Sequence, residues 1–390
     1  MQICSFLVND YAYFLSKTVY LCKKVKKRSV PLPEKACLNH LFMFIINLIC
    51  VTLHSMITNI ENIYKAVANY RLEASKRLVG QEKLIDDILI AFVAGGHVLL
   101  EGVPGLAKTL TIKTVAELLG LNFKRIQFTP DLLPADVTGT LIYEQGKGTF
   151  SVRKGPIFGN IILADEINRA PAKVQSAMLE AMEERQVTIG EQSYKLPDPF
   201  FVLATQNPVE QEGTYNLPEA ELDRFLMKLL IQYPTADNEI QIVKTAGKAP
   251  LIPVKQVITA WDIEAMKTAA DQVACDEKLI EYIVSILTVT RPEEASHKQQ
   301  SGRTIVNTTN TNDITRYIHF GASPRAGIAM LQCAKVHALF ESRDFVLPED
   351  IKAVALNVLR HRLVLSYEAA ADNVSADEII SQILDFVPVP

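Results

Sequence analysis

The sequence predicts an α/β domain, built on a parallel sheet flanked by helices, followed by an all-α domain. Three observations support this prediction. Short apolar runs in the first 235 residues have the length and hydrophobicity of buried parallel strands. Stretches with helical spacing of apolar residues surround the first of these runs. After Tyr233-Pro234 the pattern is helical to the end of the chain, broken by prolines. The expected strands are 97–100, 161–164, 200–204 and 227–231.

Helices are expected over residues 57–89, before the first strand, and over 110–119, after it. A glycine-rich loop ending in Lys108-Thr109 lies between this strand and the second helix, which is the context of a phosphate-binding P-loop. Backbone N–H groups of such a loop bind phosphates, the lysine reaches the β- and γ-phosphates, and the threonine hydroxyl ligates Mg²⁺. Ala107 stands where a glycine is usual, and a glycine turn before a core helix is the alternative. The expected nucleotide-binding residues are Gly102, Val103, Pro104, Gly105, Leu106, Ala107, Lys108, Thr109 and Leu110.

Polar side chains also follow the second and third strands. Asp165 and Glu166 come directly after strand 161–164, in the arrangement called Walker B. Asp165 is expected to hold Mg²⁺ and Glu166 to polarise the attacking water. Asn207 follows strand 200–204, where a side-chain amide would help to position that water. A solvated acidic pair is the alternative, which the upstream P-loop disfavours.

Two arginines complete the candidate site. Arg224 precedes the last strand, and in a ring of ATPases it would face the phosphate of the neighbouring subunit. Arg325 lies in the first turn of a helix that begins after Ser323. A cation there opposes the helix dipole, which suggests a partner anion, and the γ-phosphate is the expected one. An ordinary solvated arginine is the alternative at both positions.

The charge is divided unevenly along the chain. Residues 1–55 carry a net charge of +5 and the other 335 residues carry −9. The negative body argues against a general electrostatic grip on nucleic acid. The apolar run at 41–53 has 13 residues, whereas spanning a bilayer takes roughly 20. Residues 1–55 are interpreted as a membrane-associating extension, an ordered appendage, or sequence upstream of a true start at Met56, and the last interpretation is favoured. Membrane association is expected only if residues 1–55 are present.

Together these motifs resemble the MoxR family of AAA+ ATPases over about residues 60–370. The matching segments are GVPGLAKT (102–109), QFTPDLLPADVTG (127–139), GPIFGNIILADEINRAPAKVQSAMLEAMEE (155–184), FVLATQNPVEQEGTYNLPEAELDRF (201–225), GASPRA (321–326) and VLRHR (358–362). The resemblance implies a P-loop AAA+ core with a five-stranded parallel sheet over 56–235 and a helical lid over 236–390. It also makes Ala107 normal for the loop, and implies a β-hairpin at Val187–Leu196. The polar run Lys298–Asp313 matches nothing and is expected to be an exposed lid loop.

The resemblance further assigns roles. Gly80 and Gln81 are expected beside the adenine, Asn207 as sensor 1, Arg224 as the arginine finger and Arg325 as sensor 2. It implies a Mg²⁺-dependent ATPase in the cytoplasm that forms a ring, and the ring expected for an AAA+ protein is a hexamer. Such a ring would remodel or mature a protein client, with proteins carrying von Willebrand factor A domains as one possible class. Two alternatives stay open: a nucleic-acid-stimulated motor and a nucleotide-gated scaffold with little turnover.

Overall fold

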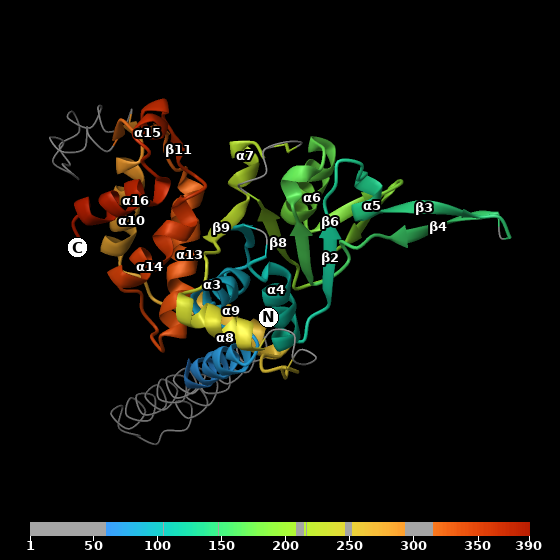
Figure 1. Ribbon diagram of the computed structural model, residues 1–390, viewed down its shortest axis with the longest axis horizontal. Coiled ribbons are helices and arrows are strands. Elements are labelled where there is room, and N and C mark those ends of the chain that lie inside the picture. Colours follow the sequence, from blue (N-terminus) through green and yellow to red (C-terminus); the bar gives the residue numbers. More distant parts are fainter. Residues whose placement is uncertain are drawn as a thin grey trace, which may run out of the picture. The chain divides into compact units, whose positions relative to one another are not determined.

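The computed structural model describes residues 60–103, 105–146, 148–207, 214–215, 217–245, 252–292 and 315–390, which belong to one compact unit (Figure 1). The expectations for residues 1–55, for Pro104 and for the polar run 298–313 lie outside the described residues. No helix in these described ranges is long and apolar enough to cross a membrane.

Five parallel strands form the central sheet in the order β2-β5-β8-β1-β9. They are β1 (His97–Glu101), β2 (Phe123–Gln127), β5 (Ile161–Asp165), β8 (Phe201–Gln206) and β9 (Phe225–Leu230). The four expected strands are therefore confirmed, with ends that differ by one or two residues. We did not identify β2 from the sequence, because this edge strand buries Ile126 and leaves most of its other side chains exposed. It lacks the continuous apolar run of a central strand.

Alternate side chains of the strands enter two separate apolar layers, as the two-residue period of a strand requires. Leu99, Ile162 and Val202 pack in one layer with α5 (Pro134–Thr138) and α6 (Ala172–Glu184). Their neighbours Leu100 and Leu163 pack in the other layer with α3 (Glu82–Val93) and α4 (Lys108–Leu119). The second layer is continuous with the apolar core of the lid.

Two β-hairpins lie on the α6 side of the sheet. The expected hairpin is present as β6 (Gln186–Ile189) and β7 (Gln192–Lys195). A second hairpin, β3 (Gly139–Glu144) and β4 (Thr149–Lys154), extends away from the sheet (Figure 1). Leu141, Tyr143 and Phe150 are exposed on it, and the last two rings lie 5.2 Å apart. Because neither face of this hairpin is buried, its sequence has no alternation of polar and apolar residues from which the two strands could be predicted.

The region after β9 is helical. Its helices among the described residues are α8 (Ala236–Thr245), α9 (Ala260–Gln272), α10 (Glu277–Val289), α13 (Pro324–Phe340), α14 (Pro348–Leu359), α15 (Tyr367–Ala371) and α16 (Ala376–Phe386). It also holds a short antiparallel pair, β10 (Ile318–Phe320) and β11 (Val364–Leu365). Strands of two and three residues are too short for an alternation pattern to reveal.

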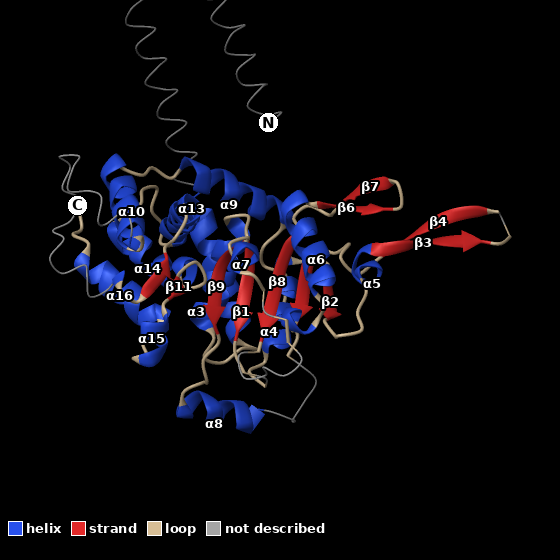
Figure 2. Cartoon of the chain, turned by 90° about the horizontal axis from the view of Figure 1, so that it is seen from above, coloured by secondary structure: helices blue, strands red, loops and turns tan. Residues whose placement is uncertain are grey.

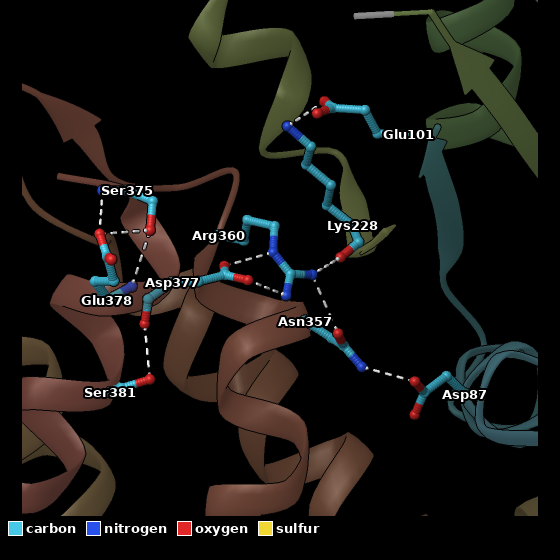
Figure 3. Close-up of polar contacts among 9 residues, drawn as sticks. All are labelled: Asp87, Glu101, Lys228, Asn357, Arg360, Ser375, Asp377, Glu378 and Ser381. Atoms are coloured by element: carbon cyan, nitrogen blue, oxygen red, sulfur yellow. Dashed lines mark hydrogen bonds and ion pairs between the residues drawn. The ribbon is translucent and has the colours of Figure 1, made fainter. Parts of the chain in front are cut away.

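A polar network joins the sheet to the helical region (Figure 3). Arg360, which follows α14, donates from Nη1 to the backbone oxygen of Lys228 in β9 at 2.6 Å. Lys228 pairs with Glu101 at the end of β1, also at 2.6 Å. Asn357 of α14 donates from Nδ2 to Oδ2 of Asp87 in α3 at 2.9 Å. These contacts fix α14 against both a strand and a helix of the sheet domain.

Asp87 makes this junction sensitive to pH. Burial raises the pKa of Asp87 to about 6, although Lys83 and the Asn357 hydrogen bond act in the opposite direction. A carboxyl group with a raised pKa in the folded state disfavours folding when it is charged. This cost is fully present above about pH 6 and disappears as the pH falls toward about 4.

We therefore expect Asp87→Asn to stabilise the protein near neutral pH. The neutral amide avoids the cost of a buried charge, so the gain should be roughly 1 to 3 kcal/mol at about pH 7.5. The gain should shrink toward zero at about pH 4, which melting temperatures measured across this range would show. Glu264→Gln, which changes an exposed acid on α9, is the control. A gain that does not depend on pH would contradict the assignment.

Candidate functional site

The loop between β1 and α4 has the backbone of an anion-binding site. Gly105 has φ of 89° and Ala107 has φ of 56°, so both lie in the left-handed region. Among the described residues, α4 has no side-chain cap and no acidic residue in its first turn. Its N-terminal N–H groups and positive dipole end therefore suit a phosphate group. Lys108, the first residue of α4, donates from Nζ to the carbonyl oxygen of Gly102 across this loop.

Gln81 holds the loop from the opposite side. Its Nε2 donates to the carbonyl oxygen of Leu106 at 3.2 Å, and its Oε1 accepts from Thr111 of α4. Gly80 beside it has φ of 71°, and a Cβ atom there would collide with the Asn238 side chain of α8. The structure thus places Gly80 and Gln81 between the loop and α8, and their expected position beside the adenine stays a prediction.

Lys108 lies within the electrostatic reach of the acidic residues at the sheet edge. Burial lowers the pKa of Lys108, while Asp165, Glu166 and Glu101 act to raise it. The parallel strands β1 and β5 both flank β8, so Lys108 and the acidic pair lie at the same edge of the sheet although they are more than fifty positions apart in the sequence.

Asp165, the last residue of β5, is held by two donors. The Thr205 hydroxyl donates to its Oδ1 at 2.7 Å. Arg125 of β2 donates to its Oδ2 from Nη2 at 2.6 Å and from Nε at 3.1 Å. The carboxylate is thereby fixed between the two strands that flank β5 in the sheet.

Glu166 follows in the left-handed region, with φ of 57°. Its backbone N–H donates to the same Thr205 hydroxyl at 2.8 Å, so Thr205 bonds to both members of the acidic pair. Gln127 donates from Nε2 to the Glu166 Oε2 at 3.0 Å, and Arg169 lies 3.2 Å from the same oxygen. Asn207 is buried and directly follows β8, at the same edge of the sheet.

The two candidate arginines have different acidic partners. Arg224 pairs with Glu183 of α6 at 3.4 Å and is about one third exposed. Arg325 is 64% exposed and lies 4.0 Å from the Asp223 Oδ2. Arg362, only 4% exposed, donates to the other oxygen, Oδ1, at 2.7 Å. The anion expected near Arg325 is the γ-phosphate, and that expectation stays a prediction; within the chain, Arg325 lies beside the carboxylate of Asp223.

Sequence reasoning assigned no role to Thr205, Arg125, Gln127, Asp223 or Arg362. Each stands within or near a matched segment, but its partner is distant in the sequence. The contacts from Arg125 and Thr205 to Asp165 span 40 residues, and the contact from Arg362 to Asp223 spans 139. Only the strand register and the packing of the lid reveal such pairs.

The donor set fits a nucleotide together with Mg²⁺. A threonine hydroxyl on Thr109 and a carboxylate on Asp165 are the hard oxygen ligands that Mg²⁺ accepts, and this ion ordinarily keeps several waters and phosphate oxygens as its other ligands. The described part of the chain holds no group of three or more His, Cys, Asp or Glu residues arranged as a metal cage. A magnesium ion shared with phosphates does not need one.

Comparisons with known proteins identify relatives over most of the chain. Residues 97–227 match the family model described as "ATPase family associated with various cellular activities (AAA)", and residues 311–383 match the AAA lid domain. The chain is 45% identical over 318 residues to the chaperone MoxR1 of Mycobacterium tuberculosis, covering 82% of this chain and 81% of that protein. It is 43% identical over 314 residues to the uncharacterised protein YeaC of Bacillus subtilis, covering 80% and 91% of the two chains.

A solved structure shares the fold. The crystal structure of a proposed ATPase from Cytophaga hutchinsonii superposes with a TM-score of 0.78 at 45% sequence identity. The match covers 87% of this chain and 99% of that one.

The geometry predicts that the Thr205 hydroxyl stabilises the acidic pair. Thr205→Val keeps the shape of the side chain but leaves the Glu166 N–H and the Asp165 carboxylate without this partner. We expect a loss of roughly 1 to 3 kcal/mol in the free energy of unfolding, measured with denaturant. Thr205→Ser keeps the hydroxyl and is the matched control, with a smaller expected loss. Equal stability of the two variants would show that the hydroxyl is not needed.

Proposed function

Because the chain belongs to the MoxR family of AAA+ ATPases, we propose that it is a Mg²⁺-dependent ATP hydrolase whose assembled ring remodels a protein partner. The observation that carries this proposal is the convergence of Lys108, Asp165 and Glu166 at one edge of the sheet, next to the anion-binding loop. Lysine, loop amides and paired carboxylates are what phosphoryl transfer from ATP to water requires.

Each side chain has a defined role in this proposal. Lys108 and the loop N–H groups bind the phosphates. Thr109 and Asp165 would hold Mg²⁺, which would neutralise the negative charge that develops on the phosphate oxygens. Glu166 orients the attacking water and accepts its proton, while Asn207 contributes an amide to the same water. The products are ADP and phosphate. Arg125 and Thr205 hold Asp165 in position, and Gln127 orients Glu166.

A ring would complete this site. Arg224 is partly exposed, and its partner Glu183 is itself about half exposed, so their ion pair contributes little to stability. The guanidinium is therefore easily turned toward the phosphates of a neighbouring subunit, where it would stabilise the transition state. A hexamer is the assembly that the family resemblance implies. Arg325 would approach the γ-phosphate of its own subunit from the lid.

A protein is the partner that the surface favours. The hairpin β3–β4 presents Leu141, Tyr143 and Phe150 to solvent, and apolar patches of this kind suit a protein surface better than a phosphate backbone. The turn of the hairpin β6–β7 packs against it, because a Cβ atom on Gly190 would come within 2.7 Å of the Leu141 side chain. A client with a von Willebrand factor A domain in the cytoplasm remains the expectation from the family.

Substitutions at the P-loop and at the acidic pair separate binding from hydrolysis. Lys108→Ala should weaken the binding of a fluorescent ATP analogue, because the substitution removes the positive charge that pairs with the phosphates. Glu166→Gln should bind the analogue nearly as wild type does, but lose about 10² to 10⁴-fold in phosphate release. Lys113→Ala, an exposed lysine on the same helix, is the control and should change neither.

The same assays decide between the alternatives. Negligible wild-type turnover at high protein concentration would replace the hydrolase with a nucleotide-gated scaffold. Turnover that rises with DNA and falls steeply with salt would favour a nucleic-acid motor. Turnover of Glu166→Gln at the wild-type rate would remove Glu166 from the mechanism.

Mixing two inactive variants tests the ring. Arg224→Ala should bind nucleotide but lose about 10³-fold or more in turnover, as removal of an arginine finger does. Mixed with Lys108→Ala, it should regain part of the activity, since some interfaces then combine an intact P-loop from one subunit with Arg224 from the other. No recovery on mixing, or full turnover by Arg224→Ala alone, would contradict a role across the interface.

A further inference from the structure

A charged cavity lies at the edge of the sheet where the strands begin, opposite the loop between β1 and α4. Its volume is about 260 Å³. It is bordered by the end of α3, the end of α6, and the lid helices α9 and α13. Figure 2 shows α9 at this edge, whereas α8 lies beyond the opposite edge, where the strands end. The cavity is thus separate from the site that holds Lys108.

Three cations line this cavity. Arg185 comes from the end of α6, and Lys267 and Lys335 come from α9 and α13. Asp271 is the one carboxylate among the described lining residues, so the lining carries two net positive charges. Like charges gathered around one space repel each other unless an anion lies between them.

The chain neutralises these cations only in part: Asp271 lines the cavity, and Asp198 lines an adjoining pocket together with Arg185 and Lys267. Arg185 donates from Nη2 to the carbonyl oxygen of Gly95 at 3.2 Å, and Lys335 donates from Nζ to the backbone carbonyl oxygen of Asp271 at 3.2 Å. Both partners are neutral backbone groups. Within the described ranges, Lys267 has neither a hydrogen bond nor an ion pair, and none of the three cations forms a salt bridge.

The backbone at Arg185 adds a second observation. Arg185 ends α6 in the left-handed region, with φ of 52°. Glycine is the favoured residue at such a helix end, and a side chain there costs roughly 1 kcal/mol. The position nevertheless carries a guanidinium that points back along the cavity wall to Gly95. Guanidinium groups bind phosphate with two parallel hydrogen bonds, which a lysine cannot do.

We propose that this cavity binds a small phosphate-bearing anion with at least two negative charges. The volume is slightly below the roughly 300 to 1,000 Å³ typical of pockets for larger ligands, so the anion is of the size of pyrophosphate or a small phosphate ester. Because Arg185 belongs to the sheet domain and the two lysines belong to the lid, the bound anion connects the two regions. It would stabilise their contact in addition to the network around Arg360.

Calorimetric titration with pyrophosphate tests the proposal. The protein used is the full chain carrying Lys108→Ala, so that the P-loop does not compete for the probe. We expect saturable binding that weakens with added salt, and a rise in melting temperature with pyrophosphate. Adding Lys267→Met should weaken binding by about tenfold or more, whereas Lys267→Arg should retain it.

The matched control is Lys278→Met, which removes an exposed lysine from α10, outside the cavity. It should leave pyrophosphate binding unchanged, and Lys335→Met replaces Lys267→Met if the latter fails to fold. Absence of binding, or binding that neither cavity lysine affects, would overturn the proposal. If citrate bound as tightly as pyrophosphate, the proposal that the ligand is a phosphate-bearing anion would be wrong. The titration needs no ATP turnover, so it stands or falls independently of the proposed hydrolase.

Discussion

All five strands of the sheet run in one direction, and the site depends on this constraint. In a parallel sheet the carboxyl ends of the strands meet at one edge, although the residues at those ends are far apart in the sequence. Glu101 is paired with Gln206, and Gln127 with Asp165. The acidic pair, the P-loop and Asn207 therefore gather without any local contact between them in the chain. A slip of one residue in β5 would turn Asp165 into the apolar layer, and that layer resists the slip.

The same edge contains backbone conformations that are unfavourable in isolation. Ala107 and Glu166 both adopt left-handed angles, which cost roughly 1 to 2 kcal/mol each for residues other than glycine. Thr205, only 1% exposed, offsets part of this cost at Glu166 through its hydrogen bond to the N–H. The apolar layers on both faces of the sheet hold the strands on which these residues depend. The strain thus lies at residues of the proposed phosphate site, and the apolar packing that supports these residues lies in the two layers of the sheet.

The sequence predicted those parts of the site that are contiguous in the chain. Lys108 and Thr109 follow a strand and begin a helix, and Asp165-Glu166 end a buried strand, so a local pattern was sufficient for each. The sequence did not predict the hydrogen bonds from Arg125 and Thr205 to Asp165, because these contacts depend on which strands are neighbours and on their register. Edge strand β2 and the hairpin β3–β4 were missed for a related reason. Their exposed faces remove the polar-apolar contrast on which pattern recognition relies.

The partner of Arg325 shows how structure changes an inference from sequence. Local reasoning predicted the γ-phosphate near this arginine, and that stays a prediction; within the chain, Arg325 lies beside Asp223, which two arginines share unequally. Arg362 is buried and bonds to Asp223 Oδ1 and to the carbonyl oxygens of Phe225 and Leu226, so it fixes the lid to the start of β9. Arg325 reaches only Oδ2, at 4.0 Å, and is mostly exposed. If Arg325 turned toward a phosphate, Asp223 would keep its stronger partner and the lid would stay attached. If Arg325 binds the γ-phosphate as proposed, the sharing of Asp223 between a buried and an exposed arginine would let Arg325 move while Arg362 keeps the lid attached.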